Sequence, residues 1–401
     1  MGDVFHELIS YLSNHSIINT HSHHLEDASF QHFNLDKLLT KSYVNWCGVP
    51  LGTSSNGREE YLSKVRYKSY FIWLQKSLQD LYGFDEPISE ENWELISSRM
   101  EAAHQDENYH FTLLQQKCRY DKVILDTYWQ PGNNNGRPDF FTPAFRVDPF
   151  FFGYSEHSMN HDGNSSMSLY GIVAKDLDEY IASIKEMILL KKMKGCVALK
   201  CAIAYDRDLD FKEVSKEMAG RVLRCSETNR TEQDIKAFQN YLFWRICEIA
   251  AELGLPLQCH TGMGQLKGTR AMAMKDVIEK NPDTKFVLFH CSFPWMDDIN
   301  ALLHSYRNVY PDLCWLPILS PAASQRMIHE LIEVGTSDKV CWGCDTWTSE
   351  ESYGALLAFR FALATVLENN VEVGYFSLKD AKKVMDNLLY NNAASLYGLK
   401  K

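Results

Sequence analysis

The sequence contains no cluster of lysine and arginine residues, and it has no uninterrupted apolar stretch of about 18 residues. Its 41 basic residues are outnumbered by 52 acidic ones, which gives a formal net charge of −11 at pH 7. Nucleic acids and anionic membrane surfaces attract concentrated positive charge, so we expect neither as a partner. The missing apolar stretch predicts that no segment spans a membrane.

Targeting and disulfide signals are also missing. The first residues show no basic segment followed by an apolar one, so no secretory signal is predicted. The eleven cysteines lack the spacing of a disulfide framework, and we expect free thiols in a reducing cytoplasm. Cys259, Cys291 and Cys344 adjoin potential metal ligands. Because neighbours on a strand face opposite sides, we expect these thiols to pack as small hydrophobes, with metal coordination as the alternative.

The sequence does have regularly spaced apolar runs with strand character. Eight such runs are 16–19, 122–126, 140–146, 196–200, 256–260, 286–290, 310–316 and 340–345, and helical patterns between them cover 176–193, 232–253, 269–280 and 320–334. Strands that alternate with helices predict a parallel sheet, and eight units predict closure. We therefore expect the α/β class, as a distorted (β/α)8 TIM barrel. With 401 residues, 45% of them hydrophobic, the chain has the material for one barrel domain over residues 1–401.

Two connections are longer than a barrel needs. Residues 57–117 have an amphipathic helical pattern, which we interpret as a helical insertion after the first strand, over the barrel mouth. Packing on the outside of the barrel is the alternative. The second connection, 151–170, is rich in glycine, serine and asparagine, and a loop of this length is either a lid or irregular surface.

Histidines stand at the end of the first apolar run. Side chains two apart on a strand point the same way, so His21 and His23 converge on one point. Neutral imidazole is a common metal ligand. A histidine-rich surface turn is the alternative, since other histidines lie nearby in the sequence.

Three later runs end in further potential ligands, namely His260, His290 and Asp345. In β/α barrels the carboxyl ends of the strands form the mouth, where the active site lies. A buried, hydrogen-bonded histidine or a helix-capping aspartate explains any one of these residues alone. The repetition of the pattern favours a metal site.

These residues resemble the amidohydrolase superfamily of metal-dependent barrels. The resemblance rests on His21 and His23 on the first strand, a lysine on the fourth, His260 on the fifth, His290 on the sixth and Asp345 on the eighth, and on an ending, 387–399, that is similar to the closing helix of the amidohydrolase-related branch. Within the superfamily the sequence most resembles uronate isomerase. That likeness is carried by 33–35 after the first strand, the aromatic helical insertion after Tyr67, 145–148 as an Arg-Pro-Asp-like turn, and Gly195 with Cys196 before the fourth strand.

The sequence also departs from uronate isomerase. Val147 replaces the proline of the Arg-Pro-Asp turn, and Lys200 and His290 are groups on which that family does not rely. The last two resemble the hydrolytic members, in which a carboxylated lysine bridges two metals and the histidine binds a second metal or orients substrate. Lys200 lies in an apolar run, where a lone ammonium is costly. Carboxylation, a substrate carboxylate or an acidic neighbour would compensate it.

The resemblance implies a divalent ion bound by His21, His23, Asp345 and His260. Nitrogen and oxygen ligands make zinc the default, with manganese or iron as alternatives, and one or two ions. Asp345 would be general base and then general acid, while His290 polarises the carbonyl. Lys200 completes the expected catalytic set.

Substrate-binding residues are also expected after the third and fourth strands. Arg146 suits a bidentate clamp on a substrate carboxylate, and a structural salt bridge with Asp148 is its alternative. Tyr205 and Arg207 would add contacts.

The predicted function is a metal-dependent hydrolase acting on an amide, ester or lactone of a small, carboxylate-bearing substrate. Isomerisation or non-oxidative decarboxylation on the same site is one alternative, and a binding protein that retains the barrel is another. The sequence leaves open whether the chain forms a homo-oligomer.

Overall fold

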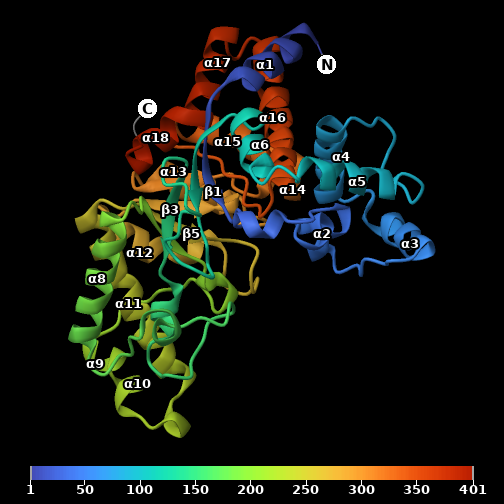
Figure 1. The fold of residues 1–401 in the computed structure, drawn as a ribbon. Coiled ribbons are helices and arrows are strands. Elements are labelled where there is room, and N and C mark those ends of the chain that lie inside the picture. Colours follow the sequence, from blue (N-terminus) through green and yellow to red (C-terminus); the bar gives the residue numbers. More distant parts are fainter. Residues whose placement is uncertain (1, 400–401) are drawn as a thin grey trace. The chain divides into compact units, whose positions relative to one another are not determined.

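The computed structural model describes residues 2–399 and shows an α/β fold (Figure 1). Seven strands are hydrogen-bonded in the order of the sequence. They are β1 (Ile17–Ser22), β2 (Tyr120–Leu125), β3 (Phe141–Arg146), β4 (Ala198–Cys201), β5 (Leu257–His260), β6 (Phe286–Phe289) and β7 (Val309–Asp312). The α/β class that the sequence predicts is therefore confirmed.

Helices precede β1, occupy most of the connections between the strands and follow β7. They are α1 (Asp3–Asn14), α2 (Leu35–Thr40), α3 (Ser55–Val65), α4 (Ser69–Tyr82), α5 (Trp93–Ala103), α6 (Tyr109–Gln116), α7 (Ser166–Tyr170), α8 (Leu177–Met193), α9 (Lys216–Ala219), α10 (Arg221–Arg224), α11 (Glu232–Leu253), α12 (Lys275–Lys280), α13 (Asp297–Ser305), α14 (Leu316–Leu319), α15 (Pro321–Val334), α16 (Ser349–Glu372), α17 (Leu378–Asp386) and α18 (Asn392–Tyr397). The alternation of strand and helix follows the predicted order.

The chain is organised in two compact units. The first contains the described residues up to Val123, with Leu313–Glu330 and Trp342–Asn391; the second contains Ile124–Asp312, Leu331–Cys341 and the described residues from Asn392 onward. The prediction of one domain stays a prediction.

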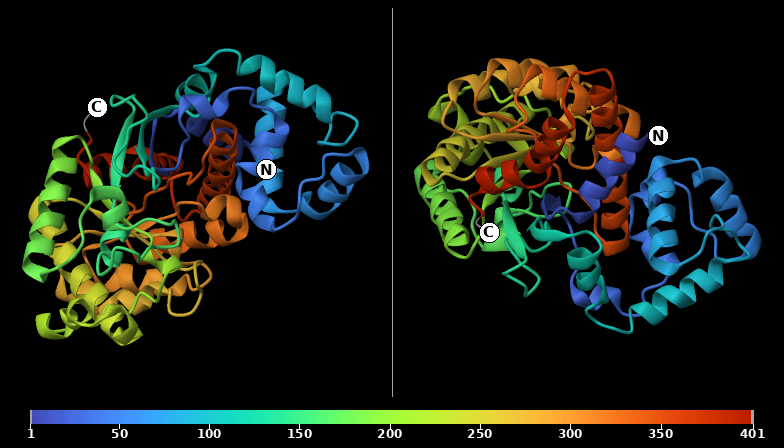
Figure 2. Two further views of the ribbon diagram at one scale, coloured as in Figure 1. Left: turned by 60° about the horizontal axis from the view of Figure 1, so that its bottom comes forward. Right: turned by 90° about the horizontal axis from the view of Figure 1, so that it is seen from above.

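The first unit is built around the long helix α16, which packs against α1, α4 and α6. The helices α2 to α5 gather in one group, drawn in shades of blue in Figures 1 and 2. A buried hydrophobic cluster extends from Phe30 to Met100 and includes Trp93. The predicted helices of residues 57–117 are thus present, and they share a core with α2.

The second unit contains the parallel strands β3 to β7. The register pairs Arg146 of β3 with Lys200 of β4, and His260 of β5 with Phe289 of β6. The helices α8 (green) and α11 (yellow-green) pack together in this unit, as Figure 1 shows. The side chains of Asp176 and Thr231 accept hydrogen bonds from backbone N–H groups in the first turns of α8 and α11. These caps explain why both helices begin where they were predicted.

The eighth predicted strand, 340–345, is not a regular strand in the structure. In the second unit, Cys341 forms an isolated parallel bridge with Asp312. In the first unit, the backbone N–H of Thr20 donates to the carbonyl of Trp342, and that of Asp345 to the carbonyl of His21. The segment therefore forms backbone hydrogen bonds like those of a strand. It does not keep the backbone conformation of a strand to its end, because Asp345 has a φ of 59°.

The sequence also made predictions about membrane-spanning segments and about the cysteines. Between residues 2 and 399, no helix is both long and apolar enough to cross a membrane. All eleven cysteines lie in this part of the chain as free thiols, and Cys259, Cys291 and Cys344 are buried, as expected of small hydrophobic side chains.

Candidate functional site

The first unit brings His21, His23 and Asp345 together. The two imidazole rings lie 4.8 Å apart between centroids, on the same side of the chain as predicted. Asp345 Oδ1 lies 3.4 Å from Nε2 of His21 and 3.2 Å from Nε2 of His23. All three residues are buried. They form a compact group of two nitrogens and one carboxylate oxygen.

The backbone holds this group in place. The N–H of His23 donates to the carbonyl of Thr346 at 3.0 Å, next to the bond between Asp345 and His21. The backbone of Gly343 lies so close to β1 that a Cβ atom at position 343 would be 2.5 Å from the backbone nitrogen of His21. Only glycine permits this approach without displacing the neighbouring strand.

The geometry of the group fits a divalent ion. Ligand atoms about 2.0–2.1 Å from a tetrahedral zinc ion stand about 3.3 Å from one another. The two measured nitrogen-to-oxygen distances, 3.4 and 3.2 Å, match that spacing. The residues present therefore suit a metal with nitrogen and oxygen ligands.

The second unit brings His260, His290 and Lys200 together. Nε2 of His290 lies 3.0 Å from Nδ1 of His260, while Nε2 of His260 contacts the carbonyl of Met263. Burial, together with His290 and Lys200, holds the pKa of His260 well below its usual range. His260 is therefore a neutral imidazole with both nitrogens engaged, and its predicted role as a metal ligand stays a prediction.

Lys200 is buried, and its Nζ lies 3.9 Å from the centre of the Phe289 ring. The ring offers its negative face to the ammonium. This contact stabilises the cation that the apolar sequence context makes costly.

Arg146 is surrounded by carboxylates in the second unit. Its Nη2 donates to Asp126 at 2.7 Å and its Nη1 to Asp162 at 2.9 Å, with Asp148 at 3.5 Å. Burial opposes its charge, but Asp126 and Asp148 hold the pKa of Arg146 above its usual range. Burial also raises the pKa of Asp148 to about 6. The Arg146 guanidinium, which was predicted to clamp a substrate carboxylate, thus contacts carboxylates of the protein. The alternative prediction, a salt bridge with Asp148, is one of these contacts.

The two remaining predicted residues differ in their surroundings. The Tyr205 ring packs on His260 with a centroid distance of 4.5 Å. Arg207 pairs with Asp208 at 3.3 Å and lies over the Phe211 ring. Tyr205 therefore joins the His260 group, whereas these contacts hold Arg207 in its own loop.

Residues 221–399 match the family described as Amidohydrolase. The match covers less than half of the chain. Protein fluG of Emericella nidulans is 31% identical to this chain over 150 residues, which are 36% of this chain and only 17% of that relative.

Two solved structures share the fold of this chain. Uronate isomerase of Thermotoga maritima has a TM-score of 0.79 at 16% identity, covering 99% of this chain and 98% of that one. A metal-dependent hydrolase of Lactobacillus casei has a TM-score of 0.72 at 15% identity, covering 98% and 97%. At these identities the two structures show a shared fold, and it is the fold that the sequence resemblance implies.

The sequence pattern did not point to some of the residues around these groups. Asp126, beside Arg146, follows β2 directly, so the rule that selected the other strand-terminal ligands would have found it. Trp347 stacks on His23 at 5.5 Å, two residues beyond Asp345. Glu351 gave no signal, because an acidic residue in the first turn of a helix is usually exposed.

Glu351 is buried at the start of α16 in the first unit. Its Oε1 accepts a hydrogen bond of 2.6 Å from the backbone N–H of Tyr43. Burial raises the pKa of this carboxyl to about 8. The folded protein therefore keeps Glu351 protonated at neutral pH.

We expect Glu351→Gln to change how stability depends on pH. Between the ordinary value, about 4.5, and about 8, the folded chain binds a proton that the unfolded chain does not. The contribution of Glu351 to the free energy of unfolding is thus full below about 4.5 and is lost as pH rises to about 8. As pH rises over this range, the free energy of unfolding of the variant should increase by a few kcal/mol relative to that of wild type. Urea denaturation of the metal-free proteins would measure this difference. A constant difference between the two proteins would contradict the assignment.

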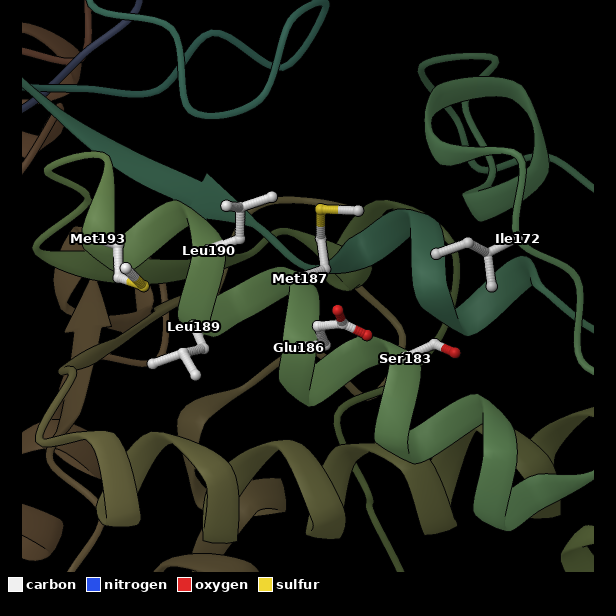
Figure 3. Close-up of a pocket in the computed structure, with 7 residues that line it drawn as sticks. All are labelled: Ile172, Ser183, Glu186, Met187, Leu189, Leu190 and Met193. Carbon is white, nitrogen blue, oxygen red and sulfur yellow. The ribbon is translucent and has the colours of Figure 1, made fainter.

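A surface groove of about 460 Å³ along α8 lies elsewhere in the second unit (Figure 3). It is lined by Ile172, Ser183, Glu186, Met187, Leu189, Leu190 and Met193. None of the predicted site residues lines it, so it has no part in the proposed chemistry.

Proposed function

We propose that this protein is a metal-dependent hydrolase that attacks an amide, ester or lactone carbonyl of a small, carboxylate-bearing substrate with activated water. The observation that supports this most strongly is the grouping of His21, His23 and Asp345 at the ligand spacing of a tetrahedral ion. We propose zinc, because two imidazoles and a carboxylate suit it, with manganese and iron as alternatives.

A divalent ion held by these three side chains would lower the pKa of a water molecule from about 15.7 toward 7, and hydroxide would then be available near neutral pH. Asp345 is suited to accept the proton of the attacking water and to return it to the leaving group. A carboxylate serves first as general base and then as general acid in such a cycle. Its placement within 3.4 Å of both imidazoles keeps its oxygen at the reacting centre.

For the second unit we propose that Lys200 acts as a free ammonium, with one ion per chain. The cation–π contact with Phe289 supports this form, since carboxylation would remove the positive charge. The roles predicted for His260 as ligand and His290 as carbonyl-polarising group stay predictions. Carboxylated Lys200 with two ions is the competing form, and Lys200→Ala should leave metal content unchanged only in the single-ion case.

Arg146 is proposed to recognise the substrate carboxylate. Binding there requires the substrate to displace Asp162 from Nη1, because that carboxylate now holds the donor at 2.9 Å. Contacts from Tyr205 and Arg207 to substrate, a cytoplasmic location and the absence of a nucleic-acid partner likewise stay predictions.

Metal analysis combined with a substrate panel tests the proposed function. We expect about one ion per chain and acid release from lactones, esters or N-acyl amino acids, lost with a chelator and restored by zinc. The alternatives from the sequence are aldose–ketose isomerisation and decarboxylation. Conversion of a uronate without acid release would favour isomerisation over hydrolysis. Release of carbon dioxide would favour decarboxylation. A chain that binds no divalent ion would contradict the proposal as a whole.

A further inference from the structure

Aromatic rings of the first unit form a continuous layer that starts at the proposed metal ligands. Trp347 stacks on His23 with a centroid distance of 5.5 Å and an interplanar angle of 24°. Tyr43 packs on Trp347 at 4.9 Å, and Trp46 lies 6.0 Å from Trp347. These separations fall in the range of attractive ring contacts. The layer therefore connects the ligand group to Trp46 without interruption.

Two more rings support this layer from behind. Trp315 stacks on Tyr43 at 5.3 Å, and Tyr70 does so at the same distance. Tyr43 and Trp315 are buried. The backbone N–H of Tyr43 donates a hydrogen bond of 2.6 Å to Glu351. These contacts fix the inner part of the layer in the packed interior of the first unit.

The outer end of the layer is exposed. Trp46 remains 54% accessible to solvent even though its ring touches three others. A large aromatic side chain left open beside a packed cluster costs hydrophobic free energy that a bound apolar group would recover.

We propose that Trp46 and Trp347, which pack against the buried ring of Tyr43, bind a planar apolar group, such as an aromatic ring, that the substrate carries next to the reacting carbonyl. This inference rests on the proposed function, because it needs the carbonyl to be held at His21, His23 and Asp345. It narrows the substrate class from small carbonyl compounds to those with an aryl or similarly flat, apolar substituent. Stacking on indole is the contact that provides this selectivity.

Two hydroxamates test the inference with the zinc-loaded full chain. Acetohydroxamate and benzohydroxamate share one metal-chelating group and differ in the phenyl ring. Calorimetric titration should show benzohydroxamate binding at least tenfold more tightly. Trp46→Ala should weaken benzohydroxamate at least threefold and leave acetohydroxamate within twofold, and Trp46→Phe should restore most of the difference. Tyr67→Ala removes a tyrosine that is 85% exposed in the same unit and should change neither affinity.

The possible failures are distinguishable. Equal affinities of the two hydroxamates for wild type, or an equal loss of both in Trp46→Ala, would overturn the aromatic layer as a substrate site while leaving the metal site intact. If neither compound binds the zinc-loaded chain, the proposed metal site is wrong, and the inference falls with it.

Discussion

His23→Ala is expected to lose its bound divalent ion and to lower kcat/KM by about a hundredfold or more, since one of three ligands is removed. The fold should survive, because His23 lies just beyond β1 and outside the hydrophobic core. Metal content by mass spectrometry and urea denaturation of metal-free protein would measure the two effects separately. Asp345→Asn should behave similarly.

His6→Ala is the matched control for this change. His6 is an exposed histidine of α1 in the same unit, so its loss should alter neither metal content nor turnover. If His23→Ala keeps the metal and full turnover, the ligand group has been assigned to the wrong residues.

Arg146→Ala is expected to destabilise the protein by about 3–5 kcal/mol, because the change leaves Asp126 and Asp148 buried without their cation. Chemical denaturation followed by circular dichroism would measure the loss. Arg221→Ala is the matched control, since Arg221 is 64% exposed and pairs with Asp234 only at 3.5 Å. A surface pair of that kind contributes about 0–1 kcal/mol.

A double variant separates charge from packing at Arg146. Adding Asp126→Asn removes the carboxylate that Arg146 contacts most closely, so the combined variant should recover part of the lost stability. An Arg146→Ala protein as stable as the Arg221 control would show that the carboxylates around Arg146 are compensated in another way.

Helix boundaries could be predicted where the sequence carries its own capping signals. Helix α11 has the predicted bounds because Thr231 and Asp234 form a capping box and Gly254 adopts a φ of 66° at the other end. These signals act within a few residues of one another, so a local pattern contains them completely. The histidine pair of β1 is predictable for the same reason, because strand alternation alone sets the directions of the two side chains.

Features that depend on unusual backbone geometry or distant partners could not be predicted. His290 and Asp345 have positive φ angles of 62° and 59°. An apolar run contains no signal that its last residue leaves the strand conformation. Asp162 reaches Arg146 from a loop 16 residues away, and no periodicity relates the two. Glu351 was missed because its hydrogen-bond partner, the backbone N–H of Tyr43, lies 308 residues away in the sequence.

The proposed ligand group joins residues that are far apart in the chain. His21 is translated early and Asp345 late, and the hydrogen bond between their backbones closes a loop of several hundred residues. A nascent chain therefore cannot hold the ion with all three ligands until the segment containing Asp345 has left the ribosome. Once bound, the ion would favour the folded state by mass action. Metal supply during synthesis would then influence the yield of folded protein as well as its activity.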